Sequence, residues 1–85
     1  MSHTVEFTPR AEMELAALQR SDQLRIAKKV DALATTPRPS GSKKLAGPEG
    51  FYRIRVGDFR VIYAIQDRKL LILIIRIGNR REVYR

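Results

Sequence analysis

Three arginines between Phe51 and Tyr63, in the stretch FYRIRVGDFRVIY, are the residues of this chain best suited to chemistry. The stretch alternates in polarity on both sides of Gly57-Asp58, which predicts two antiparallel strands joined by a two-residue type II′ turn. That turn places Arg55 opposite Arg60, with Arg53 on the same face because side chains alternate along a strand. The other face is then apolar and carries Tyr52, Ile54, Val56, Phe59, Val61 and Tyr63.

Such a cluster of like charges favours an anion-binding site. Like charges directly across a strand pair repel, and an anion held between them removes the repulsion. An ordinary solvated sheet face is the alternative, because antiparallel sheets are commonly polar on one side. The paired positions of Arg55 and Arg60 favour the anion site.

Most other catalytic groups are missing from the sequence. It has no cysteine and a single histidine, His3, which excludes disulfides, thiolate metal sites and histidine-dependent triads. No phosphate-binding or dinucleotide-binding glycine motif is present. We therefore expect no cofactor and no metal. Arginine, lysine and tyrosine remain, and they suit phosphate binding and stabilisation of a phosphoryl transition state, with RNA supplying its own 2′-hydroxyl nucleophile.

The length and charge of the chain restrict its class. Its 85 residues predict one domain, 1–85, and the net charge is +8. All of the excess lies after Pro37, where twelve basic residues face four acidic ones. Nucleic acid is the first partner to consider, with an acidic protein or a membrane surface as competitors. No apolar run approaches the roughly 20 residues of a membrane span, and no signal peptide is recognisable, so a cytoplasmic protein is predicted.

The N-terminal half predicts a strand followed by a helical hairpin. Residues 3–8 alternate as a half-buried strand, and Thr8-Pro9 is typical of a helix N-cap and first position. We predict that Ser21 caps the second helix. The apolar stripes that would pack on a sheet are Ala11, Leu15 and Leu18 on the first helix and Ile26, Val30 and Leu33 on the second.

The stretch 35–50 is rich in proline and glycine and is predicted to be an irregular connection. It brings Lys43 and Lys44 beside the start of the strand at Phe51. Both lysines are candidates for RNA binding, although a solvated loop is the simpler interpretation.

The apolar run from Leu70 to Ile77 predicts a central strand. A three-residue turn near Asp67 would place Leu71, Leu73 and Ile75 on the core face and Arg76 with the arginines, and a two-residue turn would reverse them. We favour the first arrangement, because burying Arg76 under the helices is costly. The chain then continues through the turn-forming pair Gly78-Asn79 to a basic tail with Arg80, Arg81 and Tyr84.

The order of these elements resembles the RelE/ParE superfamily of bacterial toxins, in particular the RelE branch. The resemblance covers almost the whole chain and is most specific at YRIR (52–55), FRVIY (59–63) and GNRREVY (78–84). It implies an α+β fold of the RelE-like microbial ribonuclease type, in which a helical hairpin packs on a small, mainly antiparallel twisted sheet.

The same resemblance implies a toxin of a type II toxin–antitoxin pair that cleaves mRNA on the ribosome and is neutralised by a cognate antitoxin. It assigns catalytic roles to Arg53, Arg55, Arg60, Arg80 and Tyr84. From the basic residues themselves we predict further RNA contacts, at Lys43, Lys44, Arg76 and Arg81. Lysines stand at positions 53 and 55 in the best-known members. Because arginine is not deprotonated in proteins, neither Arg53 nor Arg55 is a general base here.

Two other functions are compatible with the same sequence. A ParE-like inhibitor of DNA gyrase would share the fold without cutting RNA. A non-catalytic module that binds nucleic acid or an antitoxin would need only the positive charge.

Overall fold

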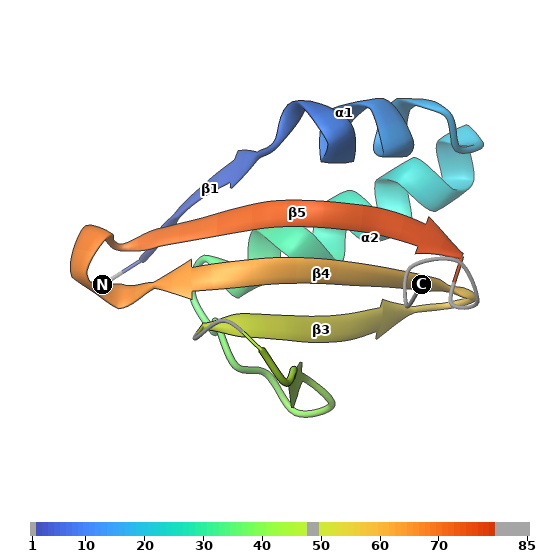
Figure 1. Ribbon diagram of the computed structural model, residues 1–85. Coiled ribbons are helices and arrows are strands. Elements are labelled where there is room, and N and C mark those ends of the chain that lie inside the picture. Colours follow the sequence, from blue (N-terminus) through green and yellow to red (C-terminus); the bar gives the residue numbers. More distant parts are fainter. Residues whose placement is uncertain (1, 48–49, 80–85) are drawn as a thin grey trace.

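A five-stranded sheet with strand order β1-β5-β4-β3-β2 forms the frame of the molecule (Figure 1). The computed structural model describes residues 2–47 and 50–79. Strand β1 (Thr4–Phe7) runs parallel to β5 (Leu71–Asn79), and all other neighbouring strands are antiparallel. Next to β5 come the central strand β4 (Phe59–Gln66) and then β3 (Phe51–Val56), and the short β2 (Lys43–Lys44) forms the other edge. The predicted α+β architecture with a mainly antiparallel sheet is confirmed.

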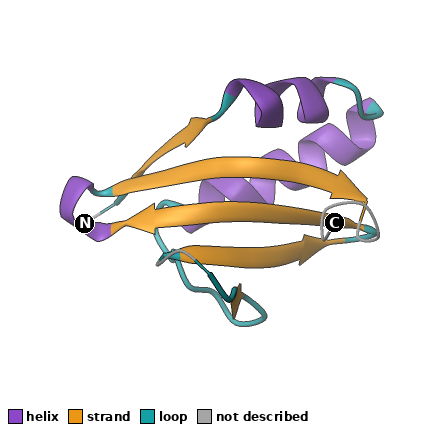
Figure 2. Ribbon diagram, in the orientation of Figure 1, coloured by secondary structure: helices purple, strands orange, loops and turns teal. Residues whose placement is uncertain are grey.

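Two helices, α1 (Pro9–Ala16) and α2 (Arg20–Leu33), lie on one side of this sheet, with α2 crossing behind β4 and β5 (Figure 2). Their predicted apolar stripes are confirmed. Ala11, Ile26, Val30 and Leu33 are buried, whereas Leu15 and Leu18 are partly buried against the same core. The sheet contributes Val61, Tyr63, Ile72, Ile74 and Ile77 to this core.

The sequence predicts the N-cap residue correctly for α1 but not for α2. Thr8 caps α1, and its Oγ1 accepts a hydrogen bond from the backbone N–H of Ala11 at 3.1 Å. The prediction that Ser21 caps α2 is wrong, because the helix begins at Arg20 and its N-cap, Gln19, makes no side-chain cap. Instead Gln23 reaches back from α2, and its Nε2 donates to the carbonyl of Leu18 at 3.0 Å.

The hairpin of β3 and β4 has the predicted register. Val56 pairs with Phe59, Arg55 with Arg60 and Ile54 with Val61. Gly57 has a φ of +60°, while Asp58 does not have a positive φ, as a type II′ turn requires. The two faces of the hairpin are therefore the ones that the alternation predicts.

The connection from β4 to β5 differs from the prediction. A 3-10 turn (η1, Asp67–Lys69) and Leu70, with a φ of +50°, join Gln66 to its partner Leu71. Four residues in the connection put Ile72 and Ile74 in the core, so the expectation that Leu71, Leu73 and Ile75 face it is wrong.

A β-bulge in β5 nevertheless places Arg76 on the predicted face of the sheet. Tyr63 pairs with Ile74, but the preceding residue Ile62 pairs with Arg76, so Ile75 is an extra residue on β5. Such a bulge reverses the facing of every later residue. Arg76 consequently shares its face with the arginines, and Ile77 returns to the core.

The Pro/Gly-rich connection contains a strand that the sequence did not predict. Lys43 pairs with Arg53 and Lys44 with Tyr52, and the backbone N–H of Leu45 donates to the carbonyl of Phe51 at 2.9 Å. β2 is therefore an edge strand rather than a loop. In the described part of the chain, no helix is long and apolar enough to cross a membrane.

Candidate functional site

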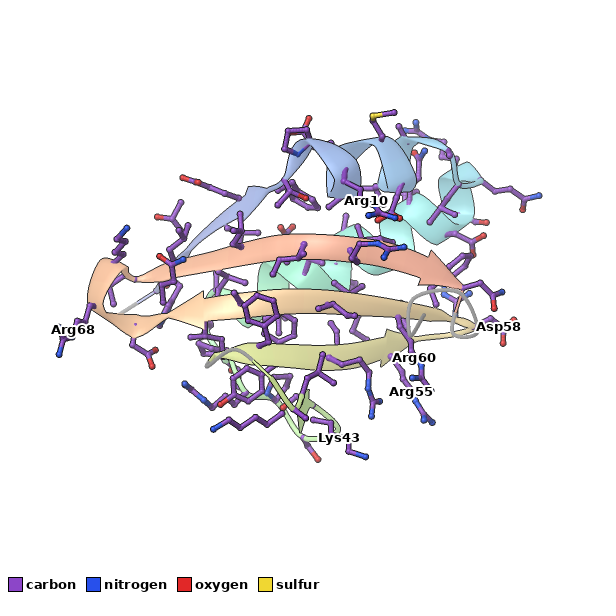
Figure 3. All side chains as sticks on the ribbon, in the orientation of Figure 1. Arg10, Lys43, Arg55, Asp58, Arg60 and Arg68 are labelled. Atoms are coloured by element: carbon purple, nitrogen blue, oxygen red, sulfur yellow. The ribbon has the colours of Figure 1, made fainter. Side chains whose placement is uncertain are left out.

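Arg55 and Arg60 lie directly across from each other on the sheet face that α1 and α2 do not cover. Side chains at such paired positions have their Cβ atoms about 4.5–5.5 Å apart. Figure 3 shows both side chains leaving the end of the hairpin in the same direction, close to the turn at Asp58. Arg55 is exposed and Arg60 half-buried, so two guanidinium groups converge at one end of the sheet.

Arg53 shares this face but is almost entirely covered. Its exposed fraction is 7%, and it is the buried charged residue of the described core. In the ladder it lies between Lys43 on β2 and Ile62 on β4. Arg53 therefore forms part of the floor beside the Arg55 and Arg60 pair, and Arg55 is the more accessible contact for a bound phosphate.

The two lysines of β2 diverge because neighbouring residues of a strand point to opposite faces. Lys43 is paired with Arg53 and so joins the arginine face. Lys44 is paired with Tyr52 and lines a recess with Arg38 and Asp67 instead. Of these two lysines, both predicted to contact RNA, only Lys43 lies with the arginines.

Arg76 is on the arginine face by register, yet its guanidinium is held by an acidic residue. Its Nε donates to Oε2 of Glu14 on α1 at 3.2 Å, and Oε1 of Glu14 accepts from the backbone N–H of Ile77 at 2.8 Å. Glu14 thus connects α1 to the end of β5, past Ile74, the last residue of β5 that pairs with β1. The structure gives Arg76 a structural contact that the sequence did not indicate.

Gly78 is the cross-strand partner of Arg60. Because glycine has no side chain, nothing on β5 projects over the Arg60 guanidinium at this position. The remaining predicted site residues, Arg80, Arg81 and Tyr84, follow directly in the sequence and lie outside the described residues.

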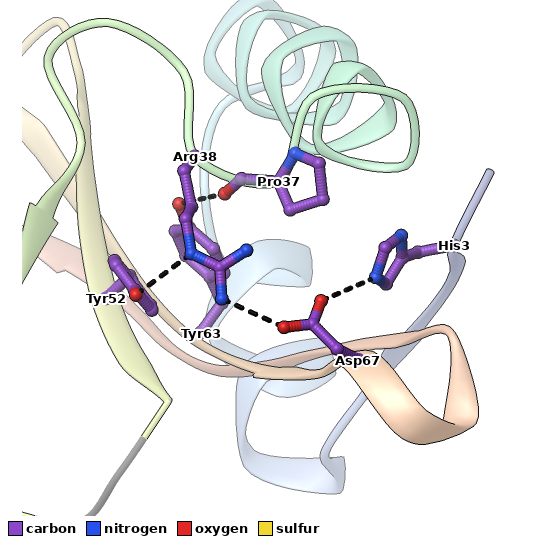
Figure 4. Close-up of polar contacts among 6 residues, drawn as sticks. All are labelled: His3, Pro37, Arg38, Tyr52, Tyr63 and Asp67. Carbon is purple, nitrogen blue, oxygen red and sulfur yellow. Dashed lines mark hydrogen bonds and ion pairs between the residues drawn. The ribbon is translucent and has the colours of Figure 1, made fainter. Parts of the chain in front are cut away.

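A second polar cluster, which sequence reasoning missed, joins four separate segments at the opposite end of the sheet (Figure 4). Asp67 accepts from Nη2 of Arg38 at 3.0 Å and lies 3.2 Å from Nε2 of His3. Nε of Arg38 donates to the hydroxyl of Tyr52 at 3.0 Å, and the guanidinium sits 5.2 Å from the ring centre. We call His3, Arg38, Tyr52 and Asp67 the clasp. Its members are far apart in sequence, so no local pattern could have revealed it.

Electrostatics in and beside the clasp follow from these contacts. The hydrogen bonds from Arg38 and then His3 lower the pKa of the Asp67 carboxyl below its ordinary value. Burial raises the pKa of Tyr63 to about 12, and its hydroxyl donates to the carbonyl of Pro37 at 2.8 Å. Tyr63 is thus a neutral structural donor at physiological pH and no candidate for proton transfer.

The chemistry of the arginine face is restricted to positive charge and hydrogen-bond donation. Arg55 and Arg60 can hold and stabilise a phosphoryl group, but neither can accept a proton. Among the described residues, no group of three or more His, Cys, Asp or Glu side chains could hold a metal ion.

Comparison with known proteins assigns the family. The family model described as the ParE toxin of the type II toxin–antitoxin system parDE matches residues 5–84. The chain belongs to the RelE/ParE superfamily of toxins. The predicted family is thereby confirmed.

Individual relatives of this RelE/ParE chain carry RelE names. RelE1 of Methanocaldococcus jannaschii is 31% identical over 88 residues, which cover 100% of this chain and 98% of the relative. The mRNA interferase RelE of Shigella flexneri is 26% identical over 87 residues, covering 99% and 92%. The archaeal RelE–RelB complex of Pyrococcus horikoshii contains a chain that matches with a TM-score of 0.84 at 28% identity, covering 96% of this chain and 99% of that one.

Proposed function

We propose that this chain is a toxin that cleaves mRNA on the ribosome and so inhibits translation. The observation that carries the proposal is the direct pairing of Arg55 with Arg60 on the sheet face without helices. The likeness to the mRNA interferase RelE of Shigella flexneri, which extends over 99% of this chain, supports the same activity.

In the proposed reaction the 2′-hydroxyl of the RNA attacks the adjacent phosphate. The 2′-oxygen forms a bond to phosphorus as its proton passes to water, and the bond to the 5′-oxygen breaks as that oxygen takes up a proton from water. The products are a 2′,3′-cyclic phosphate and a 5′-hydroxyl. Arg55 and Arg60 stabilise the negative charge that develops on the non-bridging oxygens. Arg53, Arg80 and Tyr84 complete the proposed site by positioning the phosphate and stacking on or orienting a base.

No described residue of this face is suited to be the general base. The attack therefore depends on alignment of the 2′-hydroxyl with the leaving oxygen, which a translating ribosome can impose on the mRNA in its decoding site. We expect the isolated protein to cut free RNA slowly and ribosome-bound mRNA efficiently, without added metal.

A cognate antitoxin is the proposed protein partner. The archaeal RelE chain to which this one is similar was solved with RelB. The net charge of +8 favours an acidic antitoxin segment by electrostatic complementarity. Induction without the antitoxin should stop growth, and co-expression should restore it.

Induction in a bacterial host followed by primer extension on abundant mRNAs tests this function. We expect new 5′ ends inside translated regions within minutes, and no such ends on the same RNA when its start codon is removed. A supercoiling assay with DNA gyrase serves as the counter-test. Gyrase inhibition without mRNA cleavage would replace the proposed function by the ParE-like one.

The chemical nature of the products checks the mechanism separately. Products ending in a 2′,3′-cyclic phosphate or 3′-phosphate agree with attack by the 2′-hydroxyl. Metal-dependent cleavage that leaves 5′-phosphates would contradict the assigned chemistry even if mRNA proves to be the substrate.

A further inference from the structure

A groove runs between α2 and the outer edge of β3. It consists of two adjoining hollows of about 540 Å³ each, which share Lys29, Ala32 and Arg55 as walls. We call it the α2–β3 groove. Its other basic walls are Arg25 and Lys28 on α2 and the buried Arg53 on β3.

Lys28, Lys29 and Arg55 bring positive charge to the groove that no ion pair among the described residues offsets. None of the described residues that line it is acidic. In the described part of the chain, Arg25 has one ion pair, at 3.7 Å from Asp22, and none is found for Lys28, Lys29 or Arg55. Several cations in one groove repel one another unless an anion neutralises them, as for any cluster of like charges.

The spacing of the helical cations suits a linear polyanion. Arg25, Lys28 and Lys29 are three and four residues apart, so they lie on one side of α2. From Arg25 to Lys29 the helix rises about 6 Å, which spreads the charges along the groove instead of focusing them at one point.

Gly57 allows the groove to reach the hairpin turn. A Cβ atom on Gly57 would lie 2.5 Å from Nη2 of Arg25, so the guanidinium rests against the bare backbone of the turn. Arg25 of α2 is thereby brought next to the turn that separates Arg55 from Arg60. Arg55 belongs both to the groove and to the arginine face, and the two surfaces are continuous through it.

We propose that the α2–β3 groove binds the phosphate backbone of an RNA strand, outside the site of cleavage. The inference rests on the proposed function, because Arg55 connects the groove to the face assigned to the scissile phosphate. An acidic peptide strand added to β3 fits less well. β2 already pairs with positions 52 and 53, which leaves only 54–56 before the turn for backbone hydrogen bonds.

Binding of a non-cleavable RNA tests the groove without any cleavage step. The probe is a short, fluorescein-labelled single strand of 2′-O-methyl RNA, which lacks the internal nucleophile. Its affinity is measured by fluorescence anisotropy for the full chain and for the double variant Lys28→Gln/Lys29→Gln. Both lysines are exposed and glutamine is a good helix former, so the variant should fold, which circular dichroism checks.

We expect the double variant to lose about 10- to 30-fold in affinity at 0.1 M salt, because each phosphate contact contributes about 0.7 to the slope of log K against log salt. The slope of log K against log salt should become shallower, by about 1.4 in magnitude, because two phosphate contacts are lost. The matched control is Arg68→Gln/Lys69→Gln, which removes two adjacent exposed charges from η1 at the far end of the sheet. This control should keep the wild-type slope.

Three results would contradict the proposal that RNA binds in the α2–β3 groove. Wild-type affinity and slope in the groove variant would show that RNA does not contact it. An equal loss of RNA affinity in the control variant would show that the effect comes from the lower net charge and not from the groove. Unchanged RNA binding with lost antitoxin binding would make the occupant an acidic peptide. Failure of mRNA cleavage in the wild-type chain would instead remove the proposed function and leave the anisotropy result standing.

Discussion

Arg60 carries the sharpest prediction for a single residue. Replacement by alanine removes one of the two guanidinium groups that face each other across β3 and β4. Removal of one preorganised donor to a developing negative charge costs about 2.7–4 kcal/mol of transition-state stabilisation, a rate loss of about 10²–10³. Arg60→Ala should show this loss in single-turnover cleavage on ribosomes, while its thermal midpoint holds or rises slightly because a cross-strand repulsion is relieved.

The control for this variant is Arg68→Ala. Arg68 is an exposed arginine in η1, at the opposite end of the sheet from the half-buried Arg60. It should cleave at the wild-type rate. A folded Arg60→Ala protein with wild-type cleavage would leave the arginine face as an ordinary solvated surface.

Tyr63 supports the fold through one buried hydrogen bond. The side chain is 0% exposed, and its hydroxyl donates to the carbonyl of Pro37 at 2.8 Å, which fixes the start of the connection after α2. Tyr63→Phe leaves that carbonyl without its donor, so unfolding in urea should become easier by about 1–3 kcal/mol. The matched change Tyr52→Phe affects an exposed hydrogen bond and should cost less. Equal losses of unfolding free energy in the two variants would show that the buried position of the Tyr63 hydrogen bond gives it no extra weight.

The β3–β4 hairpin is the element on which the arginine face depends, and its turn is sensitive to a single methyl group. Gly57 has a φ of +60°, where alanine is strained by about 1–2 kcal/mol. The added Cβ would also displace Arg25. Gly57→Ala should therefore lower the free energy of unfolding by about that amount and also weaken RNA binding.

Gly47→Ala separates the two effects of the hairpin variant. Gly47 has a φ of +108°, but a Cβ there would meet no atom within 4 Å, and Gly47 does not line the α2–β3 groove. This variant should be destabilised by backbone strain without displacing Arg25. Equal weakening of RNA binding in both variants would disprove the coupling between the turn and Arg25.

At the scale of the whole molecule, the clasp connects segments that the sheet alone does not hold. Asp67 joins the connection between β4 and β5 to Arg38 after α2 and to His3 before β1. The pKa of the Asp67 carboxyl is lowered in the folded chain, so its ionised form is favoured by folding. The resulting stabilisation is present above the ordinary pKa of aspartate and is lost as the pH falls through the lowered value.

Asp67→Asn tests the clasp by its pH dependence. At pH 7 the variant should melt at a lower temperature than the wild type. The gap should begin to close below about pH 4, the ordinary pKa of aspartate, and should close further as the pH falls through the lowered pKa of Asp67. Thermal midpoints between about pH 3 and pH 7 measure this, and a gap that stays constant with pH would assign the difference to packing instead of charge.

The sequence by itself determined the features that depend on neighbouring residues. Alternation and a Gly-Asp turn gave the hairpin register and the Arg55 and Arg60 pair, and helical spacing gave the buried stripes of α1 and α2. These patterns are legible because a two-residue turn fixes register locally and a helix repeats every 3.6 residues. The family resemblance was likewise carried by contiguous motifs.

Only the tertiary structure decided the contacts between distant segments. The bulge at Ile75 set the side of Arg76, β2 closed the edge beside Arg53, and Glu14 of α1 held the Arg76 guanidinium although 62 residues separate the two. The clasp and the α2–β3 groove also form between elements far apart in the chain. Such contacts depend on how a twisted sheet and its helices pack in three dimensions, and no local period of the sequence encodes that packing.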